Sequence, residues 1–169
     1  MPTNTDTSLY KQCSDGIVAV VQGLNLTGLM PGGAVLPAAQ VYQRLLLPVD
    51  FNNHPLPGVF VTLAPLAEAL TGPYLTTTTG TDDVAYPHAI TLVTAKNQDL
   101  SIDDAVLLCR QQLAGAFHLR RPAELAAACS LFQMSYWEPG TVLDFPMFLG
   151  ANVWASTMVV RTVVRKGRP

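Results

Sequence analysis

The last predicted strand of this chain, residues 152–165, is apolar on both of its faces. Alternate residues of a strand point to opposite sides of a sheet, so each of its faces needs a cover. Helices of the same chain account for one cover. We expect a neighbouring subunit to supply the other, with Trp154, Met158 and Val160 as outward-facing contact residues.

Charged residues are too scarce for an ordinary free monomer. They make up 13% of the 169 residues, whereas 49% are hydrophobic; a typical soluble domain carries about 25% charged residues. We therefore expect other chains to cover part of the surface. The net charge of −2 provides no global attraction to nucleic acid or acidic membranes. The longest apolar run, residues 17–21, is far below the roughly 20 residues that span a bilayer.

The order of the predicted elements indicates an α+β fold. Helices do not alternate regularly with strands, which disfavours a doubly wound sheet. We predict one domain over residues 1–169, with a mostly antiparallel sheet and two helices packed on one face. The predicted helices are 7–24 and 102–118, and the predicted strands are 38–47, 58–63, 84–95, 127–137 and 152–165.

A polar stretch interrupts this pattern at about residues 66–83. A run so rich in threonine and aspartate cannot contribute to a core, which is typical of an exposed loop or arm. We predict a flexible docking loop here. Its marker residues are Thr76, Thr77, Thr78, Thr79, Asp82 and Asp83.

The chain contains none of the usual catalytic motifs. Asp82, Asp83 and His88 are close enough in sequence for an acid/base pair or a metal site, but capping aspartates and a strand histidine explain them equally well. Three cysteines, Cys13, Cys109 and Cys129, lie far apart, which disfavours zinc and suggests buried free thiols in a cytosolic protein. The N-terminus lacks the pattern of a signal peptide. We predict no catalytic residue, metal or cofactor.

Several short patterns in the second half of the chain carry a resemblance. The sequence DVAYP at 83–87 runs into ITLV at 90–93. An acidic helix start at 103–104 precedes Arg110, Leu113 and Phe117, and the closing strand contains VVRTVVR at 159–165. In this order the patterns resemble a family of short proteins of tailed phages. The order of elements is similar to that of the tail terminator and neck-completion proteins.

The resemblance implies a structural virion protein and not an enzyme. Such subunits form six-membered rings that cap the tail tube and join it to the head connector. The implied partners are copies of the chain, the tail tube protein and the connector or neck proteins, with assembly in the host cytoplasm and no membrane or sequence-specific nucleic acid.

The C-terminal end of the chain is rich in basic residues, which allows two interpretations. The end is either a solvated terminus or a contact for an acidic neighbour, made by Arg161, Arg165, Lys166 and Arg168. The alternatives to a tail or neck subunit are a head-side adaptor or capsid-associated protein, and an enzyme that uses Asp82, Asp83 and His88.

Overall fold

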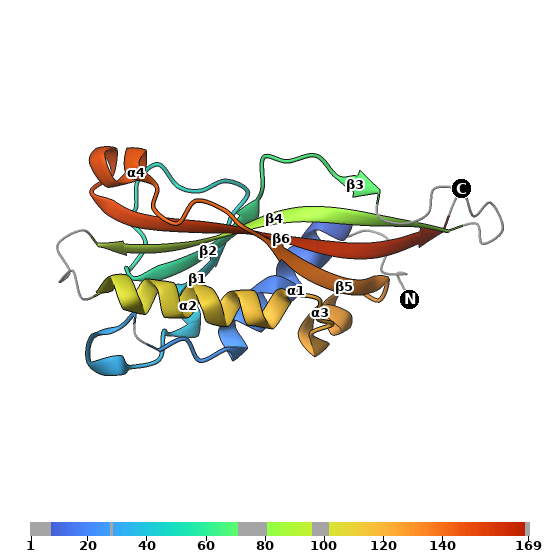
Figure 1. Cartoon of the computed structure of the whole chain (residues 1–169), viewed down its shortest axis with the longest axis horizontal. Coiled ribbons are helices and arrows are strands. Elements are labelled where there is room, and N and C mark those ends of the chain that lie inside the picture. The colour runs from blue at the N-terminus through green and yellow to red at the C-terminus, as the bar shows by residue number, and fades with distance from the viewer. Residues whose placement is uncertain (1–7, 28, 71–80, 96–101, 168–169) are drawn as a thin grey trace.

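Two long antiparallel strands form the centre of the molecule (Figure 1). The computed structural model describes residues 8–27, 29–70, 81–95 and 102–167. Strands β4 (Thr81–Ala95) and β6 (Val153–Gly167) pair without a register shift along their whole length. Both are rich in β-branched residues, which suit a pleated and buried surface.

The other strands extend this pair on both sides. The sheet order is β1-β2-β4-β6-β5, and β3 pairs separately with β4. Strand β1 is parallel to β2, whereas every other pairing is antiparallel. The bounds are β1 Val41–Gln43, β2 Gly58–Leu63, β3 Ala69–Leu70 and β5 Phe132–Glu138.

The main helices pack on one face of this sheet, below it in Figure 1. They are α1 (Leu9–Gly23) and α2 (Ile102–Phe117), with the short α3 (Ala123–Ala128) beside α1. The Ser8 hydroxyl caps α1 by accepting the N–H of Lys11. Apolar stripes of α1 and α2 meet the sheet in the main core. The predicted α+β class, with a mostly antiparallel sheet and two main helices, is confirmed.

The chain itself covers part of the opposite face. Helix α4 (Phe145–Gly150) and part of the segment between β1 and β2 lie above the sheet in Figure 1. There Phe51 packs with Phe60, Val93 and Val153 in a second, smaller core. The chain therefore covers part of the face for which we expected a neighbouring subunit, and a subunit on the rest of this face stays a prediction. A strand that is apolar on both faces reveals the need for a cover but not its source.

Met158 and Val160 do not point outward as predicted. Met158 is 1% exposed, Val160 is fully buried, and both belong to the main core under the helices. Trp154, on the same face but near the end of the sheet, stays half-buried. The predicted alternation along β6 is correct. The face that carries Met158 and Val160, however, lies under the helices, and the face that carries Val153 lies under the smaller core.

Three element predictions also need correction. The predicted strand 38–47 is a strand only over β1, because Ala38–Gln40 forms a 3-10 turn and the chain leaves the sheet after Leu45. The start of the predicted strand 127–137 belongs to α3. Residues 81–83, assigned to the loop, are the first residues of β4, because β6 supplies backbone partners for them.

Pro87 occupies the gap between β2 and β3. β2 pairs with β4 as far as His88, and β3 pairs again from Ala85. The Pro87 carbonyl accepts the N–H of Ala64 on this side. A strand residue directs its N–H and C=O to the same side, so the missing N–H of Pro87 also falls in this gap. Pro87 therefore has the environment of a strand edge locally, although it lies inside a central strand.

Candidate functional site

The basic residues of β6 find acidic partners within their own chain. Arg165 donates two hydrogen bonds to the Asp83 carboxylate, at 2.8 and 2.9 Å. These hydrogen bonds lower the pKa of Asp83. Arg161 donates from Nε to Glu138 at 2.7 Å and from Nη1 to the Ala67 carbonyl at 3.2 Å. Much of the charge expected to meet an acidic neighbour is therefore balanced internally.

The remaining predicted site residues are distributed along the molecule. The Lys166 ammonium lies 5.0 Å from the centre of the Tyr86 ring, a cation–π contact. Asp82 lies opposite Lys166 in the β4–β6 ladder, so Asp82 and Asp83 belong to a strand and not to a flexible docking loop. Thr76, Thr77, Thr78, Thr79 and Arg168 lie outside the described residues.

The residues of the enzyme alternative do not converge. Asp83 and His88 are an odd number of positions apart on β4, so their side chains point to opposite faces. His88 is fully buried against α1. Among the residues that the structure describes, no group of three histidine, cysteine or acidic side chains could hold a metal ion.

An apolar pocket opens beside the beginning of β6. It has a volume of about 310 Å³ and lies between α2, the 139–144 loop and the first residues of β6. Trp154, a predicted contact residue, forms part of its wall and packs its ring against Phe148 of α4 at 4.7 Å. The lining residues are Val106, Leu107, Val142, Leu143, Trp154, Ala155 and Ser156.

Arg110 holds one wall of this apolar pocket in place. From α2, its guanidinium donates to the Thr157 carbonyl at 2.7 Å, the Ser156 hydroxyl at 3.1 Å and the Gly140 carbonyl at 3.1 Å. Burial lowers its pKa, although a guanidinium remains charged at neutral pH. Gly140 allows the loop to approach, because a Cβ there would lie 2.4 Å from the Thr157 carbonyl oxygen. Arg110 thus ties the backbone of this wall to α2.

A second apolar surface lies on the 44–50 segment. Leu45, Leu46 and Val49 are 70%, 73% and 94% exposed. We call these three residues the apolar loop. Backbone hydrogen bonds from Arg44 to Val61 and from Leu63 to Leu45 hold the start of the segment to β2. The protein therefore presents these leucines on anchored backbone.

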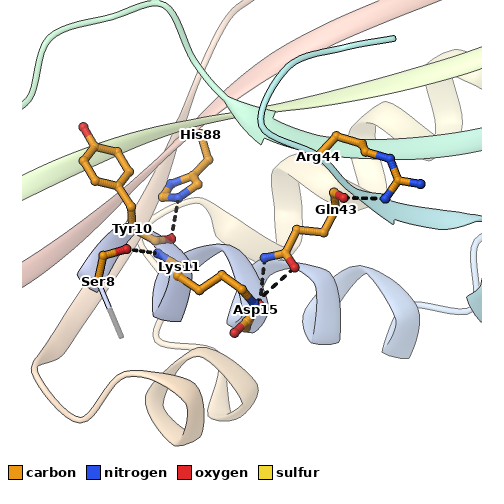
Figure 2. A network of polar contacts seen from close by, with 7 residues as sticks. All are labelled: Ser8, Tyr10, Lys11, Asp15, Gln43, Arg44 and His88. Carbon is orange, nitrogen blue, oxygen red and sulfur yellow. Dashed lines mark hydrogen bonds and ion pairs between the residues drawn. The ribbon is translucent and has the colours of Figure 1, made fainter. Parts of the chain in front are cut away.

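A polar network fixes the base of the apolar loop to α1 (Figure 2). The Gln43 amide donates to Asp15 at 2.7 Å and accepts from Lys11 at 3.3 Å, and Lys11 also pairs with Asp15. Arg44 donates back to the Gln43 carbonyl at 2.8 Å. This network joins α1 to the outer strand of the sheet and so positions the loop that follows.

Sequence reasoning missed both apolar surfaces. The predicted strand 38–47 includes Leu45 and Leu46, although Pro48 and Asp50 shortly after them favour a turn. Arg110 appeared only as part of a motif, because its acceptors lie 30 to 47 residues further along the chain. No local spacing indicates contacts of that kind.

None of the helices in the described part of the chain is long and apolar enough to cross a membrane. A comparison with protein-family models finds no match to this chain, and a comparison with curated proteins finds none either.

Proposed function

We propose that this chain is a structural virion protein, a tail terminator or neck subunit of a tailed phage. In this role it forms a ring that caps the tail tube and joins it to the head connector. The observation that carries the proposal is the pair of apolar surfaces on the folded chain. Singly exposed leucines are common in monomers, but clustered ones on anchored backbone are typical of an interface.

The placement of the two surfaces suits association into a ring. The apolar loop follows β1 at one edge of the sheet, whereas α2, the 139–144 loop and the first residues of β6 line the pocket, on the far side of β4 from β1. A contact between two different patches is heterologous, and repeated rotation about one axis closes it into a ring. In the proposed ring, Leu46 of one subunit packs into the apolar pocket of the next. The six-fold symmetry comes from the resemblance to tail terminators.

The first experiment measures the native mass of the purified protein by light scattering and native mass spectrometry. The expected species is a closed ring of six 18.1 kDa subunits, near 109 kDa. A monomer at micromolar and millimolar concentration contradicts self-assembly of the free protein. That result favours a head-side adaptor that assembles only on the particle.

A variant in the apolar loop tests the proposed contact. Leu46→Asp places a charge in the interface, where desolvation without a partner is unfavourable. We expect the variant to be monomeric, with an unchanged melting temperature. The matched control is Leu119→Asp, because Leu119 is 63% exposed and lies outside both surfaces. Dissociation by both variants, or by neither, contradicts a contact through the apolar loop.

The proposed basic contact needs a test that preserves the internal ion pair. Arg165→Glu alone removes the Asp83 pair and places two acids together. The double variant Arg165→Asp with Asp83→Arg keeps a pair while reversing both charges. If Arg165 contacts an acidic neighbour, the double variant folds and forms rings but fails in head–tail joining. Normal joining removes Arg165 from the proposed interface.

A further inference from the structure

Helices α1 and α3 approach each other unusually closely at Gly16. A Cβ at this position would lie 2.7 Å from the Leu125 Cδ2 atom and 2.8 Å from its Cα atom. Cys13 lies one helical turn before Gly16, and Cys129 lies one turn after Leu125. A disulfide requires Cα atoms within roughly 4.4–6.8 Å. The missing side chain of Gly16 therefore permits the approach that a bond between these helices needs.

The two thiols are already in contact. Both cysteines are fully buried in the main core, and their sulfur atoms are joined by a hydrogen bond. The backbone N–H groups of Leu131 and Phe132 lie next to Cys129, where the chain turns from α3 into β5, and the Phe132 N–H donates to the Cys129 carbonyl oxygen at 3.0 Å. Cys109 has a separate environment, because its thiol donates to the Thr27 carbonyl at 3.3 Å.

These contacts give the two sulfur atoms different roles. The hydrogen bond from Cys13, together with the two backbone N–H groups, lowers the pKa of Cys129. The same shared hydrogen bond, and burial, raise the pKa of Cys13. The thiolate is the reactive form of cysteine. The lowered pKa favours Cys129 as the nucleophile of the pair.

We propose that Cys13 and Cys129 form a peroxide-reactive thiol pair that closes to a disulfide between α1 and α3. Cys129 Sγ attacks one peroxide oxygen, the O–O bond breaks, and the other oxygen leaves as hydroxide, which is protonated to water. Cys129 is then a sulfenic acid. Cys13 Sγ attacks that sulfur, the S–O bond breaks, and the second water leaves. The peroxide takes up two electrons, and each cysteine supplies one.

Access for the oxidant depends on local opening. Both thiols are fully buried, so peroxide reaches them when α3 detaches from α1. With only six residues, α3 is the kind of small element that opens well below global unfolding. Disulfide formation then follows the rate of this opening. The inference does not depend on the proposed role in the virion.

The test is a thiol map of the full-length protein after treatment with hydrogen peroxide at neutral pH. The remaining thiols are alkylated in denaturant, and the peptides are identified by mass spectrometry before and after reduction. The expected product is a single disulfide between Cys13 and Cys129, with Cys109 alkylated. Its formation is reversed by dithiothreitol. Peroxide-treated unfolded protein serves as a reference in which Cys109 also forms disulfides.

Variants assign the chemistry to the pair. Cys109→Ser keeps the disulfide, whereas Cys13→Ser leaves Cys129 as a sulfenic or more oxidised acid. Gly16→Ala forces the helices apart and so strains the closed disulfide, and we expect its equilibrium yield in a thiol redox buffer to fall several-fold relative to wild type. Three alkylatable thiols after peroxide treatment just below the unfolding temperature overturn the proposal, and so does a disulfide that contains Cys109. If a serine variant does not fold, the wild-type map alone decides.

Discussion

At the scale of single residues, His88 combines burial with two backbone acceptors. Its Nε2 lies 3.2 Å from the Tyr10 carbonyl oxygen, as Figure 2 shows, and its Nδ1 lies 3.3 Å from the Tyr86 carbonyl oxygen. A neutral imidazole carries one N–H and satisfies one of these acceptors. The protonated ring could satisfy both. Burial nevertheless dominates and lowers the pKa of His88.

This depressed pKa predicts a loss of stability in acid. The unfolded chain, in which the histidine pKa is about 6.5, binds the proton more readily than the folded protein. The contribution of His88 is therefore present above this pH and is lost as the pH falls below it. We expect the unfolding free energy of wild type to fall more steeply from neutral to acidic pH than that of His88→Gln. Urea titrations at a neutral and at an acidic pH measure the unfolding free energy of both proteins. An equal decrease in wild type and in His88→Gln contradicts this prediction.

The Arg110 hydrogen bonds predict a second residue-scale effect. Arg110→Met removes the donors to Gly140, Ser156 and Thr157. We expect a loss of about 1–3 kcal/mol in unfolding free energy, because buried acceptors lose their partner. Arg121→Met is the control, because exposed Arg121 makes a longer contact of 3.4 Å to Phe132. Equal effects in urea denaturation are inconsistent with a special role for Arg110.

At the scale of elements, two helical glycines predict opposite effects of the same substitution. Gly16→Ala places a methyl group against the Leu125 backbone and is expected to cost about 1–3 kcal/mol through overpacking. Gly115 lies inside α2, and a Cβ added there would meet no atom within 4 Å. Gly115→Ala therefore gains about 0.5–1 kcal/mol from helix propensity. Thermal unfolding measures both variants, and a shift in the same direction contradicts this view of α1–α3 packing.

At the scale of the whole molecule, core and interface predict different responses to an introduced charge. Met158 is 1% exposed, so Met158→Asp buries an unpaired carboxylate at a cost of about 3–5 kcal/mol. That is a large part of the roughly 5–15 kcal/mol that stabilises a domain. We expect Met158→Asp to unfold, unlike Leu46→Asp. Circular dichroism and gel filtration distinguish these results, and a folded Met158→Asp monomer is incompatible with the main core described here.

Elements with a strong local signal were predicted closely from sequence. The bounds of β2 agree with the prediction, and α1 and α2 agree within two residues at each end. Their apolar residues recur at a spacing that a helix or strand alone explains. Short elements such as α3 and α4 were missed, because six residues contain too few turns to show a period.

The candidate surfaces depended more on the fold. Leu45 and Leu46 were visible in the sequence as apolar residues, but their exposure follows from their position where the chain leaves the edge of the sheet. The pocket was not predictable, because its lining residues on α2, Val106 and Leu107, precede the other lining residues by 35 positions or more. Cys13 and Cys129 likewise come together only through the contact of α1 with α3.

The sequence by itself determined the α+β class, the long two-faced strand β6 and the need to cover both of its faces. These properties follow from local periodicity and from the free energy of burying apolar side chains. Only the tertiary structure decided that helices cover Met158 and Val160, that the chain's own Phe51 and α4 cover part of the other face, and that Arg165 pairs with Asp83. Contacts between distant segments depend on how the elements pack against one another, and local sequence patterns do not predict that packing.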